Sequence, residues 1–165
     1  MKNSSNNVVL LTGGSYDIRK KVAHGLGEKV GRSAKAFEAQ RLDPMSPLVQ
    51  EAKIWGYRKG SITGSVTIVP GILERACGGV AFLDGVERLS DKLLLRLAES
   101  LAKRMLTRIG DDLGRIELST VRHIVDGVNL DVLAILGADV KTEPLAELAA
   151  KYGWNKIHLS GSPQE

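Results

Sequence analysis

The sequence predicts a single α/β domain, residues 1–165, with a mostly parallel sheet and helices on both faces. Short apolar runs alternate with helical patterns along most of the chain. The run Val80–Asp84, "VAFLD", has no polar alternation, which is typical of a strand buried on both faces. Strands separated by helices favour parallel pairing with crossover helices. At 165 residues the chain is long enough to bury one real core.

The N-terminal half is predicted to supply two strands and two helices. Ile18, Val22 and Leu26 recur four residues apart and therefore share one face of a helix. Ser46 followed by Pro47 is the pattern of an N-cap with proline at the first helical position. The predicted elements are a strand at 8–11, a helix at 17–29, a strand at 36–40 and a helix at 47–55.

The C-terminal half follows a segment rich in glycine and serine. Ser90 is predicted to cap a long helix, because four leucines (93, 94, 97 and 101) lie on one side of it. The predicted elements are a strand at 80–84, this helix, a hairpin at 108–118, a strand at 130–136, a helix at 144–152 and a strand at 155–159. Five strands outside the hairpin predict a five-stranded sheet. Residues 160–165 are expected to be a frayed tail.

Composition places the chain among soluble globular proteins. It is 43% apolar and 25% charged, with a net charge of +4 and a pI of about 9.3. No run is long and apolar enough to span a membrane, and the N-terminus is a poor signal peptide. A lone cysteine, Cys77, excludes an internal disulfide framework. We therefore expect a cytoplasmic protein. The basic groups at 19–21 and 103–104 are expected to be solvated helix faces, with nucleic-acid binding as the alternative.

Two segments carry a family resemblance. Residues 55–65, "WGYRKGSITGS", resemble the segment FGHEKGAFTGA of the AAA+ domain of sigma-54-dependent transcription activators. Residues 71–84, "GILERACGGVAFLD", resemble the G-x-F-E-x-A-x-G-G-T-L-F-L-D run of that family at similar spacing. The resemblance covers about residues 8–159, without the family's helical lid or DNA-binding domain. It implies a three-layer P-loop NTPase-like (AAA+) core with a mostly parallel five-stranded sheet.

The resemblance places the nucleotide-binding loop at residues 13–20, where the family has G-x-x-x-x-G-K-[ST]. Of the positions at which nucleotide would bind, Gly13, Gly14, Arg19 and Lys20, only Gly13 agrees with that pattern. Ile18 stands at a glycine position, and a β-branched residue tolerates positive φ badly. Arg19 replaces the phosphate-binding lysine, and Lys20 replaces the hydroxyl residue that holds magnesium. These departures predict impaired nucleotide binding.

The hydrolytic positions also depart from the family pattern. Asp84 matches the residue that partners magnesium, but Gly85 stands where the family has the glutamate that activates water. Loss of a general base typically lowers rates by about 10²–10⁴-fold. Glu87, two residues on, would need a different backbone path to substitute for it.

Sensor and finger positions are altered as well. Gly137 aligns with the family's sensor asparagine, and the two arginine-finger positions fall on Leu145 and Lys151, of which Lys151 keeps a charge. We therefore assign no catalytic residue, expect no cofactor and predict a pseudo-ATPase. ATP with magnesium, held by Arg19 and Asp84, is the alternative.

The loop that resembles GAFTGA is better preserved. In the family this loop grips sigma-54, and here Ile62 replaces its phenylalanine with another apolar side chain. The predicted partner-contact loop consists of Gly60, Ser61, Ile62, Thr63, Gly64 and Ser65. The alternative is an ordinary Gly/Ser-rich surface loop.

Three functional hypotheses follow. The first is a degenerate AAA+ module that regulates transcription by contact with sigma-54 or intact AAA+ activators, alone or as a homo- or hetero-oligomer. The second is a weak ATPase with an atypical phosphate loop that uses Arg19, Lys20 and Asp84. The third is a retained fold that binds nucleic acid through its basic groups, with a steep dependence on salt.

Overall fold

The structure is a computed structural model of the 165-residue chain. It describes residues 7–32, 36–42, 44–57, 69–104 and 131–160. The predicted hairpin at 108–118 and the predicted contact loop at 60–65 lie outside the described residues.

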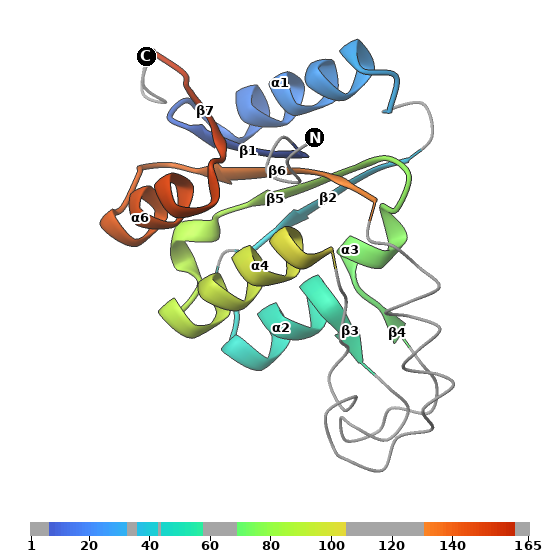
Figure 1. Ribbon diagram of the computed structural model, residues 1–165, viewed down its shortest axis with the longest axis vertical. Helices are drawn as coiled ribbons and strands as arrows, with labels where there is room; N and C mark the ends of the chain where they lie inside the picture. Colours follow the sequence, from blue (N-terminus) through green and yellow to red (C-terminus); the bar gives the residue numbers. More distant parts are fainter. Residues whose placement is uncertain (1–6, 33–35, 43, 58–68, 105–130, 161–165) are drawn as a thin grey trace.

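A five-stranded parallel sheet forms the centre of the molecule (Figure 1). Its strands are β1 (Val8–Thr12), β2 (Phe37–Arg41), β5 (Val80–Asp84), β6 (Leu133–Ala138) and β7 (Asn155–His158). They lie in the order β2-β5-β6-β1-β7, and every neighbouring pair is parallel. β1, β5 and β6 are buried along their whole length, as continuous apolar runs require. The predicted sheet is confirmed.

Helices cover both faces of this sheet, which makes three layers. Helix α1 (Tyr16–Lys29) packs on one face over a core centred on β1, β5 and β6. The opposite face carries α2 (Pro47–Trp55), α3 (Ile72–Arg75), α4 (Asp91–Lys103) and α6 (Glu143–Tyr152) over a larger core (Figure 1). Among the described residues, no helix is both long enough and apolar enough to cross a membrane.

Helix α1 buries Arg19, Ala23 and Gly27 next to its predicted apolar face. Val22 and Leu26 of that face are half-buried against the core, whereas Ile18 is 49% exposed. Small side chains at positions 23 and 27 let the helix lie close to the sheet. Arg19 can be buried because carboxylates at the sheet edge neutralise it. The expectation that residues 19–21 form a solvated face is therefore wrong for Arg19, whereas Lys20 and Lys21 are exposed.

Short elements that the sequence pattern did not predict complete the fold. Strands β3 (Gly56–Tyr57) and β4 (Val69–Pro70) form an antiparallel pair beside the end of α2. Gly56 has φ of 81°, and a Cβ there would lie 2.4 Å from the Val69 carbonyl oxygen, so only glycine fits. A 3₁₀ turn, η2 (Val86–Arg88), follows β5.

Candidate functional site

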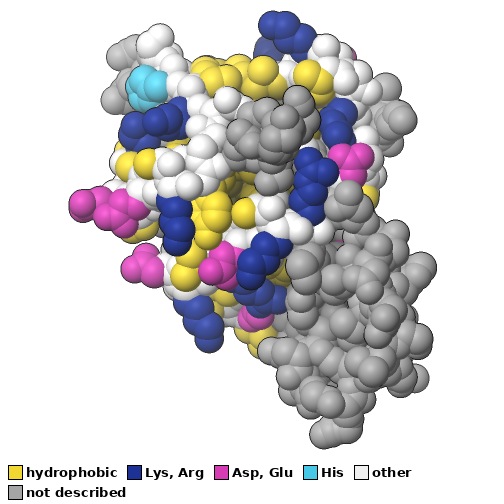
Figure 2. Space-filling view, viewed as in Figure 1, with side chains coloured by type: hydrophobic (Ala, Val, Ile, Leu, Met, Phe, Trp, Pro, Cys, Tyr) yellow, Lys and Arg dark blue, Asp and Glu magenta, His cyan; other side chains and the backbone are white. Residues whose placement is uncertain are grey.

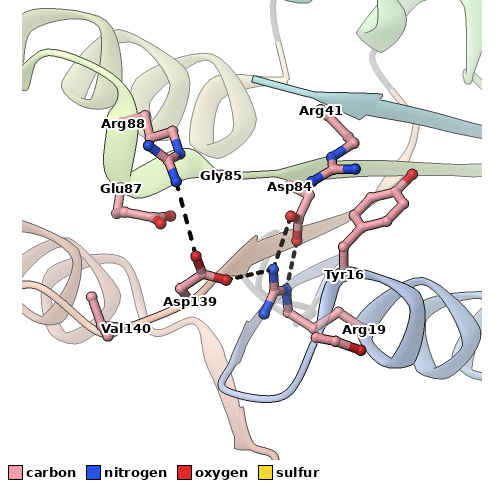
Figure 3. A pocket seen from close by; sticks show the side chains of 10 residues that line it. Tyr16, Arg19, Arg41, Asp84, Gly85, Glu87, Arg88, Asp139 and Val140 are labelled. Atoms are coloured by element: carbon pink, nitrogen blue, oxygen red, sulfur yellow. Dashed lines mark hydrogen bonds and ion pairs between the residues drawn. The ribbon is translucent and has the colours of Figure 1, made fainter. Parts of the chain in front are cut away.

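A cavity of about 400 Å³ opens at the carboxyl ends of the central strands (Figure 3). Ligands of open parallel α/β sheets bind at this edge. The cavity is lined by Ser15, Tyr16, Arg19, Arg41, Asp84, Gly85, Glu87, Arg88, Asp139 and Val140. Arg19 and Asp84 were singled out in the sequence, and the structure brings them into direct contact.

Arg19 lies at the centre of a buried ion-pair cluster. Its Nε donates to Asp84 Oδ1 at 2.7 Å, and its Nη2 donates to Asp84 Oδ2 at 3.0 Å. The Nη2 also donates to Asp139 Oδ1 at 2.9 Å. The Nη1 donates to the carbonyl oxygens of Gly13 and Gly14, at 2.9 and 2.8 Å. The planar guanidinium thus engages β5, the residue after β6 and the turn after β1 at once.

The charges in this cluster are held away from water. Arg19 and Asp84 are 2% and 5% exposed, whereas the Asp139 side chain is 53% exposed. Burial lowers the pKa of Arg19, but hydrogen bonds and charge attraction from Asp84 and Asp139 outweigh it and raise that pKa above its usual value. Arg19 is a permanent cation here, and Asp84 is its principal counter-charge.

The turn between β1 and α1 is short. Helix α1 starts at Tyr16, so only Gly13, Gly14 and Ser15 separate it from β1. Ser15 caps the helix by accepting a hydrogen bond from the Ile18 N–H at 3.3 Å. Ile18 therefore lies inside the helix, and the positive φ angles belong to Gly13 (85°) and Gly14 (68°).

Gly137 provides the space in which Asp84 meets Arg19. A Cβ at position 137 would lie 2.3 Å from Asp84 Oδ1 and 3.0 Å from Phe82 Cε1. Any side chain at this position would collide with the carboxylate as it is placed. The glycine at the predicted sensor position and the ion pair beside it are therefore parts of one arrangement.

Gly85 turns the chain so that Glu87 lines the cavity. Gly85 has φ of 90°, a conformation that favours glycine, and it leads directly into η2. Glu87 Oε1 is buried without a hydrogen-bond partner among the described residues. Burial raises the pKa of this carboxyl, and the nearby Asp139 charge raises it further. Glu87 therefore lies at the cavity, two residues after the position where the family has its glutamate.

The remaining cavity residues lie at its rim. The Arg41 guanidinium stacks over the Tyr16 ring at 4.2 Å from the centroid. Arg88 lies 4.0 Å from Asp139 on the other side of the cavity (Figure 3). Asp139 could have been predicted from the sequence, because it directly follows a buried apolar strand. Asp84 stands in a similar place, as the last residue of such a strand. Tyr16 and Arg41 carried no such signal in the sequence.

Other predicted positions do not join this cavity. Lys20 is exposed on α1. Lys151 is exposed on α6 beside Tyr152, with its Nζ 5.4 Å from the ring centroid, and Leu145 is fully buried in the core. Within the described part of the chain no group of three or more His, Cys, Asp or Glu residues could hold a metal ion.

Basic side chains are scattered over the surface. Figure 2 shows Lys and Arg side chains in several separate places on the visible face, with hydrophobic and acidic side chains between them. The described residues on this face therefore form no continuous basic patch.

Comparisons with known proteins agree with the fold and with the motifs. The sigma-54 interaction domain model matches residues 1–134. Nitrogen fixation protein AnfA of Azotobacter vinelandii is 30% identical over 130 residues, covering 76% of this chain and 24% of AnfA. The DNA-binding transcriptional regulator NtrC of Escherichia coli is 32% identical over 102 residues, covering 62% of this chain and 22% of NtrC.

The chain spans about a quarter of the length of these two relatives. Among solved structures, NtrX from Brucella abortus in complex with ADP has the same fold, with a TM-score of 0.66 at 19% identity. That match covers 94% of this chain and 32% of NtrX. The family model spans most of the chain, including both segments on which the resemblance rests, and the chain therefore belongs to the sigma-54 interaction domain family.

Proposed function

We propose that this chain is a catalytically degenerate AAA+ module that acts in transcriptional regulation through protein contact and without ATP turnover. The observation that carries the proposal is the buried Arg19 cluster. One guanidinium fills the position from which the family's lysine reaches phosphate, and it is saturated by groups of the protein itself.

The phosphate side of the site supports this proposal. A phosphate loop presents backbone N–H groups to its anion. Here the carbonyl oxygens of Gly13 and Gly14 point at Arg19 instead. The Ile18 N–H, in the first turn of α1, already donates to the Ser15 hydroxyl oxygen. An incoming phosphate would meet two carbonyl oxygens and the Asp84 and Asp139 carboxylates around the one buried cation.

The magnesium side supports it as well. Both carboxylate oxygens of Asp84 accept hydrogen bonds from Arg19, so a magnesium ion would have to displace the guanidinium. Magnesium would therefore compete with a guanidinium that already binds both oxygens of its carboxylate partner, which supports weakened Mg-ATP binding.

The protein-contact side rests on the family and on the loop sequence. The chain belongs to the sigma-54 interaction domain family, and residues 60–65 keep the small and apolar character of its contact loop. We therefore propose sigma-54 or an intact AAA+ activator as the partner, with contact made through this loop.

Two measurements test the proposal. Isothermal titration of the purified chain with Mg-ATP should give no heat at concentrations that saturate the AAA+ domain of an intact activator such as NtrC. Co-precipitation with purified sigma-54 and with that activator should recover at least one complex, which Ile62→Asp should weaken. Saturable ATP binding would contradict the proposed loss of nucleotide binding. Association with neither sigma-54 nor the activator would contradict the proposed action through protein contact.

A slow ATPase is the second candidate, and Glu87 is the observation that favours it. Its carboxyl lines the same cavity, carries an unpartnered oxygen and has a raised pKa, which suits a general base. Phosphate release that depends on magnesium and is abolished by Glu87→Gln would support this candidate. Equal release from the wild type and from Glu87→Gln would exclude Glu87 as its base.

A further inference from the structure

A second hollow lies far from the Arg19 cluster, between α2 and the β3–β4 pair. Its volume is about 300 Å³, at the lower end of the range of ligand-binding pockets. It is lined by Leu48, Val49, Ala52, Lys53, Tyr57, Val69, Pro70 and Arg75, which we call the α2 groove. Most of these side chains are apolar, and neither the cavity nor the proposed function above uses them.

Helix α2 directs apolar side chains outward at this groove. Leu48 and Val49 are 50% and 40% exposed, whereas the neighbouring Gln50 is 4% exposed. The Gln50 Nε2 donates to the Leu42 carbonyl oxygen at 3.2 Å, which satisfies its buried amide. Helix α2 therefore buries the polar Gln50 and exposes the adjacent Leu48 and Val49. Packing of the core does not require Leu48 and Val49 to be apolar.

The end of α2 beside the groove is anchored in the core. Trp55, at the end of α2, is fully buried and donates from Nε1 to Ser100 Oγ on α4 at 3.0 Å. The Arg96 guanidinium stacks on the Trp55 ring at 4.1 Å and pairs with Glu51. A Cβ at Gly71 would lie 2.4 Å from the Ile54 carbonyl oxygen, so the chain after β4 lies directly against α2. A partner would meet a preformed surface.

The groove is basic at its rim. Lys53 and Arg75 line it, and none of its described lining residues is acidic. Arg75 donates to the Pro70 carbonyl oxygen at 3.0 Å, and its Nε lies 3.4 Å from Glu38 Oε1. Exposed pairs of this kind are weak, so Arg75 can still attract an anionic partner. Apolar walls with a basic rim are complementary to an apolar segment flanked by acidic residues.

We propose that the α2 groove binds an acidic amphipathic helix of a protein partner, which inserts one or two aliphatic side chains against Leu48 and Val49. Its carboxylates face Lys53 and Arg75. Tyr57 and Val69 line the groove and are the residues on either side of segment 58–68, which contains the predicted contact loop. A bound helix would therefore touch both ends of the segment that carries that loop. The inference is independent of nucleotide binding.

The test uses a synthetic helical peptide with leucine at i, i+3, i+4 and i+7 and glutamate at the positions that flank this apolar stripe. A twin peptide carries lysine in place of glutamate. We expect the acidic peptide to bind in fluorescence anisotropy and to shift the amide resonances of residues 48, 49, 53, 57 and 69. We expect Leu48→Lys to weaken its binding about tenfold or more, since central apolar anchors dominate such interfaces.

Val30→Lys is the matched control, because Val30 is 61% exposed and lies outside the groove, after α1. It should leave peptide affinity unchanged, and thermal melting should show both variants folded. Equal binding of the two peptides, or amide shifts outside the groove, would overturn the proposal. Concentration-dependent dimerisation that Leu48→Lys abolishes would also overturn it, by making a second copy of this chain the occupant.

Discussion

Replacement of Arg19 by methionine tests directly whether the buried cluster holds the sheet edge together. The variant keeps most of the aliphatic stem and removes the guanidinium, leaving Asp84 buried at 5% exposure without its counter-charge. The Gly13 and Gly14 carbonyl oxygens also lose a donor. Asp139 is 53% exposed and can be solvated, so most of the penalty should fall on Asp84.

The magnitude follows from that burial. Removing one partner of a buried ion pair destabilises a protein by about 3–5 kcal/mol. In a chain of this size, each 1 kcal/mol lowers Tm by about 2–4 °C, so Arg19→Met should lower it by about 6–20 °C. Arg32→Met is the matched control, because Arg32 pairs with Asp131 at 2.7 Å with side chains 23% and 53% exposed. Such a pair contributes about 0–1 kcal/mol.

Urea unfolding followed by circular dichroism, with the double variant Arg19→Met/Asp84→Asn, completes the assay. Removing the Asp84 charge should recover part of the loss, with a coupling energy of about 1–3 kcal/mol between the two positions. Loss of stability no greater than that of Arg32→Met would refute the reasoning. Strict additivity of the two substitutions would refute it as well, because the penalty would then not come from an uncompensated Asp84.

Three further predictions can be checked by denaturation, and the first and last concern the same edge of the sheet. Gly137→Asn should destabilise the fold by about 1–3 kcal/mol, since its Cβ would lie 2.3 Å from Asp84 Oδ1. Gly25→Ala on α1, where a Cβ meets nothing within 4 Å, should instead stabilise it by about 0.5–1 kcal/mol in the same denaturation series. Burial raises the pKa of the Glu87 carboxyl in the folded protein above its value in the unfolded chain. The contribution of Glu87 to folding stability is therefore fully present below the unfolded-state pKa, and it is lost as pH rises through the folded-state pKa. The stability of wild type relative to Glu87→Gln should therefore fall as pH rises from about 4 upward in urea titrations, and a pH-independent difference would contradict the placement of Glu87 in the cavity.

The order of the elements could be predicted from the sequence because periodicity and capping are local. The run at 80–84 became the central strand β5 with its predicted bounds, and Ser46 and Ser90 cap α2 and α4 as predicted. Leu93, Leu94, Leu97 and Leu101 are all buried. The short pair β3–β4 was missed, since two-residue strands carry no periodic signal.

The candidate site could be predicted only in part. The motifs led to the prediction that Arg19 and Asp84 occupy functional positions, but not that they pair with each other. Residues 19 and 84 come from different elements, and their contact depends on how α1 packs over the ends of β5 and β6. The burial of Arg19 on α1 was not predicted, because a buried arginine is rare without counter-charges, and those charges lie far away in the sequence.

The sequence alone determined the α/β class and the family, and it led to the prediction that positions 19, 85 and 137 depart from the family's lysine, glutamate and asparagine. These are properties of residue type and spacing, which a chain carries before it folds. Only the tertiary structure decided what the replacements do together. Arg19 turns inward between Asp84 and Asp139, Gly137 leaves room for the pair, and Gly85 swings Glu87 into the same cavity. Such a cluster depends on side chains that only the packed sheet brings within hydrogen-bond distance.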